Sequence, residues 1–130
     1  MSRNLETLHH MRACALARDF DGLLGCLTDD IEYHWHMGTK PLIGMEKMRK
    51  FLNNYTGRFE QRQWEIYATA ENGDLLLSEG LEVIYDKTED REIRQPFMQA
   101  LEFRDGKVAK MRDYYEAANL QPSAKTAAQS

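Results

Sequence analysis

The feature of this 130-residue sequence that most limits its fold is a pair of tight-turn dipeptides in its C-terminal half. Asn72-Gly73 and Asp105-Gly106 are combinations that β-hairpin turns favour, because these residue types tolerate positive φ angles. The segments around them alternate apolar and polar residues, as strands with one buried face do. We therefore expect an antiparallel meander whose strands span 61–70, 75–85, 92–103 and 107–116, with a charged turn at 86–90.

The N-terminal half predicts helices instead. Capping residues and apolar spacing indicate a first helix capped by Ser2 or Asn4 and a short second helix capped by Asp19 or Asp21. The third helix is expected from Met45 until just before Gly57. Between the second and third helices we expect a turn at 28–30 and a strand at 31–36.

Three helices interrupted by one strand and followed by a four-stranded meander indicate an α+β roll, in which a curved open sheet packs helices on its concave face. We expect one domain over 1–119 and a flexible tail over 120–130, where the sequence has no periodicity. On the convex face, Leu81, Val83 and Tyr85 would be apolar and exposed. Such a patch is usually covered by a partner, so we expect a homodimer.

Composition excludes several functions. The net charge is −4 and the basic residues are scattered, whereas nucleic-acid binding needs a basic face. No apolar run approaches the roughly 20 residues that span a membrane, and the N-terminus lacks the apolar core of a signal peptide. Cys14 and Cys26 share no metal-ligand spacing and fall in predicted helices. We interpret them as buried reduced thiols of a cytoplasmic protein, with a disulfide or reactive thiol as the alternative.

Two segments, DFDGLLGCLTDDIEYHWHMG and KMRDYYE, resemble the nuclear transport factor 2-like superfamily. This superfamily includes the steroid isomerases, the limonene epoxide hydrolases and the polyketide-cyclase-like (SnoaL-like) proteins. The resemblance covers roughly residues 5–116. It implies a cone-shaped α+β roll of cystatin-like topology, with a cavity at the wide end.

The resemblance does not support the steroid isomerase mechanism. Trp35 stands where those enzymes have their general-base carboxylate, and Met11 stands where they have the oxyanion-hole tyrosine. Gln99 falls on or near the position of their protonated aspartate. All three catalytic groups are therefore replaced.

The epoxide hydrolase pattern matches better. KMRDYYE places Asp113 on one catalytic aspartate, and SEGLEVI places Glu82 on the other. Tyr33 matches the tyrosine of that site, whereas Trp35 replaces its asparagine. Gly80 takes the position of the arginine that orients both carboxylates and keeps them ionised, which argues against epoxide hydrolysis by that mechanism.

From this comparison and from strand parity we predict a site on the inner face of the sheet. Asp113 would be the general acid/base, Glu82 its carboxylate partner, and Tyr33 a donor to a substrate oxygen. Two carboxylates facing one apolar cavity repel, so at least one should hold a proton near neutral pH. The residues expected to contact substrate are Trp35, Met11, Phe97, Gln99 and Tyr115.

Each of these residues also has a purely structural interpretation. A carboxylate can bind a backbone amide, Trp35 can pack in the core, and Gln99 can be a satisfied buried amide. His34 and His36 have a metal-ligand spacing, but no third ligand accompanies them and their parity points away from the cavity. We therefore expect no metal and no cofactor.

The leading hypothesis is a cofactor-independent SnoaL-like enzyme of the hydrolase, isomerase or cyclase type. Its ligand would be a small hydrophobic, oxygenated molecule with a ring. The alternative is a non-catalytic module of the same fold that binds a small ligand or docks a partner protein. A carboxyl that titrates well above about 4 would favour catalysis, because a binding module needs no such shift.

Overall fold

The computed structural model describes residues 1–120, and nearly all of the expected tail lies outside this range. The helices are α1 (Arg3–Leu16), α2 (Phe20–Leu24) and α3 (Met45–Arg58), followed at the end by a 3₁₀ turn, η1 (Ala117–Leu120). The strands are β1 (Leu27–His34), β2 (Leu42–Ile43), β3 (Phe59–Asn72), β4 (Leu75–Asp86), β5 (Arg91–Arg104) and β6 (Lys107–Tyr114).

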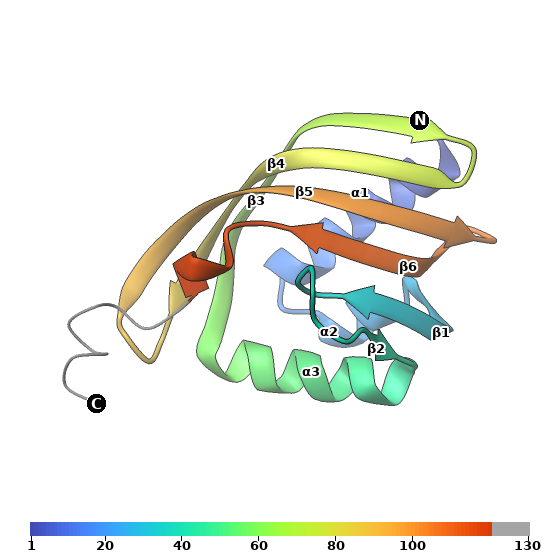
Figure 1. Ribbon diagram of the computed structural model, residues 1–130. Helices are drawn as coiled ribbons and strands as arrows, with labels where there is room; N and C mark the ends of the chain where they lie inside the picture. Colours follow the sequence, from blue (N-terminus) through green and yellow to red (C-terminus); the bar gives the residue numbers. More distant parts are fainter. Residues whose placement is uncertain (121–130) are drawn as a thin grey trace.

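The strands form a single sheet in the order β2-β1-β6-β5-β4-β3. The meander β3-β4-β5-β6 is antiparallel throughout, whereas β1 joins it parallel to β6. Figure 1 shows the sheet arching over the helices, with α3 along its open side. The curved α+β roll expected from the sequence is therefore confirmed.

Local chemistry explains where the elements begin and turn. The Ser2 hydroxyl accepts a hydrogen bond from the Leu5 amide at 3.0 Å and caps α1. Asp19 caps α2 in the same way, through the Gly22 amide at 2.9 Å. Both expected hairpins are present, with Gly73 at φ +60° and Gly106 at φ +79°.

Three expected boundaries are wrong. Residues 28–30 belong to β1 and not to a separate turn: Leu27 lies opposite Val108 of β6 and Glu32 opposite Lys110, and the residues between Leu27 and Glu32 form a bulge in the strand. The strand also ends at His34, so Trp35 lies just beyond it. Helix α3 continues through Gly57 to Arg58, since one glycine costs only about 1 kcal/mol in a packed helix. The short strand β2 was not expected at all.

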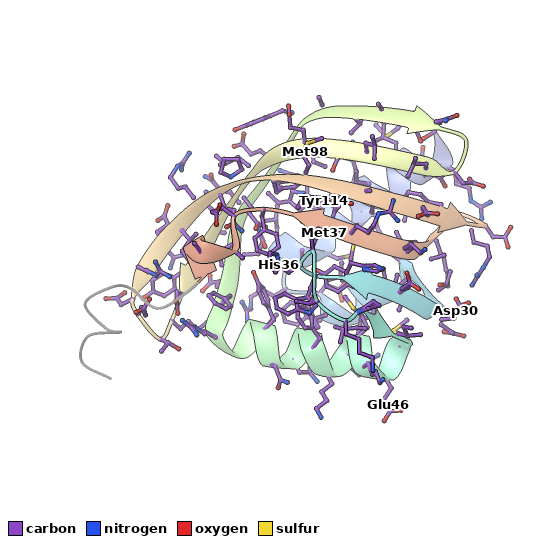
Figure 2. The ribbon with its side chains drawn as sticks, in the orientation of Figure 1. Asp30, His36, Met37, Glu46, Met98 and Tyr114 are labelled. Carbon is purple, nitrogen blue, oxygen red and sulfur yellow. The ribbon has the colours of Figure 1, made fainter. Side chains whose placement is uncertain are left out.

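The convex face also differs from expectation. Val83 is only 2% exposed within the single chain, because it lies in a central strand between the longer side chains of Gln63 and Arg94. Tyr85 is half-buried beneath the guanidinium of Arg62, which sits 4.2 Å from the centre of its ring. On strands β4, β5 and β6 of this face, the exposed large apolar residues are Leu77, Met98 and Tyr114. Figure 2 labels Met98 and Tyr114 on the outside of the sheet.

Two expectations from composition can be compared with the structure. Cys14 and Cys26 are both buried free thiols, as predicted. Cys14 lies in α1, but the expected helical position of Cys26 is wrong, because α2 ends at Leu24 and Cys26 lies in the turn before β1. Within residues 1–120, every helix is too short or too polar to cross a membrane.

Candidate active site

A cavity of about 390 Å³ lies between the inner face of the sheet and the helices. This volume suits a small organic ligand. Strands β3 to β6 supply its carboxyl and amide side chains, and further polar groups come from Arg18, Tyr33, Thr56 and Arg58. Helix α3 supplies an aromatic wall of Phe51 and Tyr55 that continues at Phe59. Phe51 also contacts the ring of Tyr33 edge-on, with their centroids 5.5 Å apart. The cavity is therefore mainly apolar, with polar groups at a few fixed positions.

Asp113 is held on β6 by two donors. The Tyr33 hydroxyl donates to its Oδ2 atom, and the Gln99 side-chain amide donates to its Oδ1 atom at 2.8 Å. Tyr33 reaches Asp113 because β1 pairs with β6, which places Tyr33 opposite Met111. Burial raises the pKa of Asp113 to about 6, while the hydrogen bonds from Tyr33 and Gln99 oppose this rise.

Glu82 has a comparable arrangement on β4. The Gln95 amide nitrogen donates to its Oε1 atom at 2.9 Å, and that of Gln61 lies 3.4 Å from its Oε2 atom. Burial raises the pKa of Glu82 to about 7, and the charge of Asp113 raises it further, against the two glutamine hydrogen bonds. Each carboxyl is thus oriented by amide donors inside a cavity that favours its protonated form.

Every site residue predicted from the sequence lines this one cavity: Met11, Tyr33, Trp35, Glu82, Phe97, Gln99, Asp113 and Tyr115. Their roles stay predictions. Trp35 faces the cavity from the segment after β1, with its ring 6.2 Å from that of Phe51. Met11 is 1% exposed and belongs to the hydrophobic core as well as to the cavity wall.

The Tyr33 hydroxyl is the one group whose contacts differ from the expected role. A phenol has a single proton to donate, and in the structure this proton is directed at Asp113. A hydrogen bond from Tyr33 to a substrate oxygen would require breaking this contact. The observed arrangement makes Tyr33 a residue that orients Asp113.

His34 at the end of β1 and His36 just after it have different surroundings. The His34 ring nitrogen Nε2 lies 2.7 Å from a carboxylate oxygen of Glu32, on the strand's other face. His36 packs near Trp35 and Tyr115, with ring centroids 5.9 and 5.6 Å away, respectively. In the part of the chain that the structure describes, no three His, Cys, Asp or Glu side chains gather as metal ligands would.

Gly80 lies where the epoxide hydrolase pattern has its arginine, and the backbone explains why no side chain stands there. A Cβ atom at this position would lie 1.8 Å from the carbonyl oxygen of Glu65 on β3. Strand β3 also shifts register beside it, between Ile66 and Ala68. Since any side chain at Gly80 would displace β3, the two carboxylates are oriented by glutamines instead.

Sequence reasoning missed several residues of the site. Gln95 shares strand parity with Phe97 and Gln99, so parity alone could have placed it in the cavity. Gln61 and Trp64 come from β3, whose inward residues were noted only as an alternating pattern. The indole Nε1 atom of Trp64 is buried and has no hydrogen-bond partner among residues 1–120.

The comparisons with known proteins agree with the fold. A family model described as a SnoaL-like domain matches residues 8–111. A sequence comparison with curated proteins finds no match.

Three solved structures illustrate the similarity of fold. A nuclear transport factor 2-like protein of unknown function from Burkholderia pseudomallei has a TM-score of 0.83 and 19% identity, covering 92% of this chain and 95% of its own. An LEH-like epoxide hydrolase from M. tuberculosis has a TM-score of 0.77 and 19% identity, covering 90% and 85%. TerC, co-crystallized with polyporic acid, has a TM-score of 0.78 and 22% identity, covering 92% and 95%. Identities this low establish the fold alone.

Proposed function

The chain belongs to the SnoaL-like domain family, and on that premise we propose that it is a cofactor-independent acid–base enzyme acting on a small, flat, oxygenated ring compound. The observation that carries the proposal is the pair of oriented carboxyls, Asp113 and Glu82, facing one apolar cavity. Amide-held carboxyls with raised pKa values are the groups that general acid–base catalysis uses near neutral pH.

The two carboxyls have different roles in this proposal. Burial raises the pKa of both carboxyls, and the charge of Asp113 raises the pKa of Glu82 further, so near neutral pH the pair holds one proton and one charge. We place the charge on Asp113, which accepts hydrogen bonds from the Tyr33 hydroxyl and the Gln99 amide. Asp113 is then the general base and Glu82 the general acid. Tyr33 and Gln99 hold the base in place, and the aromatic wall of α3 stacks on the substrate ring.

This assignment predicts how the rate depends on pH. Protonation of Asp113 removes the base below about pH 6, and ionisation of Glu82 removes the acid above about pH 7. The rate should therefore be highest between these values and fall on both sides. A rate that rises continuously to pH 9 would contradict the assignment of Glu82 as an acid.

The reaction class can be tested without knowing the natural substrate. Bicyclic ketones such as 1-tetralone in D₂O report proton abstraction as deuterium incorporation beside the carbonyl, and indene oxide reports hydrolysis as diol formation. We expect the protein to accelerate at least one of these reactions. Asp113→Asn should lower that rate by about 10²-fold or more, because it removes the base. Asp29→Asn is the matched control, since Asp29 is exposed on β1 away from the cavity.

The main alternative is a binding module that uses the same cavity without chemistry. The replacement of the hydrolase arginine by Gly80 favours this alternative. The same experiment separates the two, because a binding module would take up the ring compounds but leave every exchange and hydrolysis rate at its value in buffer.

We also propose that the protein forms a homodimer through the convex face of the sheet. Leu77, Met98 and Tyr114 lie on three neighbouring strands and are 41%, 48% and 40% exposed. Clustered apolar residues of this size favour contact with a second copy. Sedimentation velocity should report a dimer that Met98→Glu converts to a monomer, while the control Met98→Leu stays dimeric. A monomeric wild type at micromolar concentration would refute this proposal.

A further inference from the structure

Two tyrosines of the cavity carry hydroxyl groups that the fold itself does not use. Tyr55 of α3 and Tyr115, just after β6, both line the cavity. Within residues 1–120 neither hydroxyl has a hydrogen-bond partner, whereas the Tyr33 hydroxyl donates to Asp113. Neither oxygen belongs to the enclosed side-chain atoms that lack a partner, so both remain accessible. A ligand in the cavity is therefore able to reach both hydroxyls.

The ring of Tyr55 is held by aromatic neighbours at helical spacing. Phe51, Tyr55 and Phe59 recur every four residues, so their side chains follow one face of α3 and its end. The Tyr55 ring stacks on Phe51, with the centroids 6.0 Å apart and the planes at 18°, and its centroid lies 5.0 Å from that of Phe59. These contacts fix the direction of the hydroxyl before a ligand arrives.

The packing also places both phenols on the side of the cavity that holds Asp113. Tyr115 follows Asp113 by two positions, so the two side chains leave the same face of the sheet. Phe51 links Tyr55 to this part of the cavity, because its ring also meets the ring of Tyr33 edge-on at 5.5 Å. The Tyr33 hydroxyl in turn contacts Asp113.

Electrostatics agrees with this placement. Burial raises the pKa of Tyr55 well above its ordinary value, and the charges of Glu82, Tyr115 and Asp113 raise it further. Burial raises the pKa of Tyr115 to about 12, with a further rise from the charges of Asp113 and Glu82. Each phenol thus lies within electrostatic reach of both carboxyls. Both phenols keep their protons while the carboxyls titrate, and so both are donors.

Two neutral donors beside a base suit one kind of ligand atom. A carbonyl oxygen has two lone pairs and accepts from both phenols. When Asp113 takes a proton from the carbon next to this carbonyl, the electron pair of the broken C–H bond forms a C=C bond, and the negative charge moves from Asp113 to the oxygen. Hydrogen bonds to a charged oxygen are about twice as strong as those to a neutral one, so the phenols stabilise the product of this step more than the ketone.

We propose that the Tyr55 and Tyr115 hydroxyls form a donor site for one ligand oxygen, the carbonyl oxygen of a ketone that has a hydrogen on the adjacent carbon. This inference rests on the proposed function and adds a substrate class and two further catalytic residues to it. It also gives these two tyrosines the donor role that the sequence had suggested for Tyr33.

A matched pair of probes measures the donor site without catalysis. 1-Tetralone has an oxygen that only accepts hydrogen bonds, and tetralin has the same bicyclic frame without it. Tyr55→Phe and Tyr115→Phe should each lower the ratio of 1-tetralone to tetralin affinity by about fivefold, the effect of one neutral hydrogen bond. Tyr67→Phe is the matched control, because Tyr67 is 62% exposed on β3 and does not line the cavity.

The variants should fold as the wild type does, because neither hydroxyl binds another part of the chain between residues 1 and 120. Deuterium exchange of 1-tetralone then measures the stabilisation of charge. Tyr55→Phe should slow this exchange by about 10²-fold, which exceeds its effect on 1-tetralone binding, so the loss falls on kcat and not on KM. A residue that only shapes the cavity would change the affinities for both probes alike.

The outcomes distinguish this inference from the proposed function. A ratio of 1-tetralone to tetralin affinity that is the same in the wild type and in both tyrosine variants overturns the donor site. If the ratio depends on the tyrosines but the wild type accelerates neither exchange nor hydrolysis, the donor site stands and the enzyme proposal falls. If the wild type hydrolyses indene oxide while the ratio ignores both tyrosines, the enzyme proposal stands and the donor site falls.

Discussion

Replacing Glu82 by glutamine should stabilise the protein at alkaline pH and leave it almost unchanged at acid pH. Burial raises the pKa of this carboxyl from its ordinary 4.5 to about 7. The folded chain therefore resists ionising Glu82, whereas the unfolded chain ionises it freely. Glutamine keeps the shape and the acceptor oxygen for Gln95 but never becomes charged.

The size and sign of the effect follow from proton linkage. Between pH 4.5 and pH 7 the folded protein holds a proton that the unfolded chain releases, so the stability of the wild type falls as pH rises through this window. Each tenfold difference in proton affinity corresponds to about 1.4 kcal/mol. The penalty is small at pH 4.5 and reaches about 3 kcal/mol by pH 8.5. Glu82→Gln should remove this penalty.

Urea unfolding, monitored by tryptophan fluorescence at one fixed protein concentration, measures the free energies of unfolding of Glu82→Gln and of the wild type. The free energy of unfolding of Glu82→Gln minus that of wild type should grow by about 3 kcal/mol from pH 4.5 to pH 8.5. Glu46→Gln is the control, because Glu46 is exposed on α3, away from both the cavity and the proposed dimer face, and the same change there should leave the difference flat. A flat difference for Glu82→Gln as well would refute the idea that the cavity favours the protonated carboxyl.

Three further changes test other contacts. Burial raises the pKa of Asp113 to about 6, and the hydrogen bond from Tyr33 opposes this rise. Tyr33→Phe should therefore raise the pKa of Asp113 further. A ¹³C titration of the carboxyl that shows an unchanged or lower pKa would contradict this reasoning. Gly80→Ala should destabilise the fold by about 3 kcal/mol in thermal unfolding, because the new Cβ atom meets a backbone oxygen. Gly57→Ala should stabilise the fold by about 0.5–1 kcal/mol in the same assay, because Gly57 lies in a helix with open space around it. Asp86 is 0% exposed and accepts two hydrogen bonds from the Arg58 side chain, which lower its pKa. Asp86→Asn should therefore lower the free energy of unfolding by about 3 kcal/mol at pH 7 and by progressively less as pH falls below 4. Urea unfolding that gives the same loss at every pH would contradict this.

The order of helices and strands could be predicted because it depends on neighbouring residues. The Asn72-Gly73 and Asp105-Gly106 turns, the Ser2 cap and the strand alternation act over a few positions, and each is found where the sequence indicates. Strand parity also placed Glu82 and Asp113 on the inner face, because successive residues of a strand point to opposite sides.

Tertiary structure decided the contacts that join distant parts of the chain. Tyr33 and Asp113 are 80 positions apart and meet only because β1 pairs with β6, a parallel contact that no local pattern encodes. The same pairing resumes at Leu27, so residues 28–30 lie in a bulge of β1 and not in a separate turn. Val83 is buried because long side chains flank it, although its own strand pattern predicted exposure.

The site also has properties that the sequence determined and properties that only tertiary structure decided. The sequence determined which carboxyls face the cavity, because a side chain's face follows from its position along the strand. Only the folded sheet decided which amide holds each carboxyl, that Gly80 must lack a side chain, and that the Trp64 indole stays unpaired. These properties depend on the register and close approach of neighbouring strands, and so they arise only when the sheet is assembled.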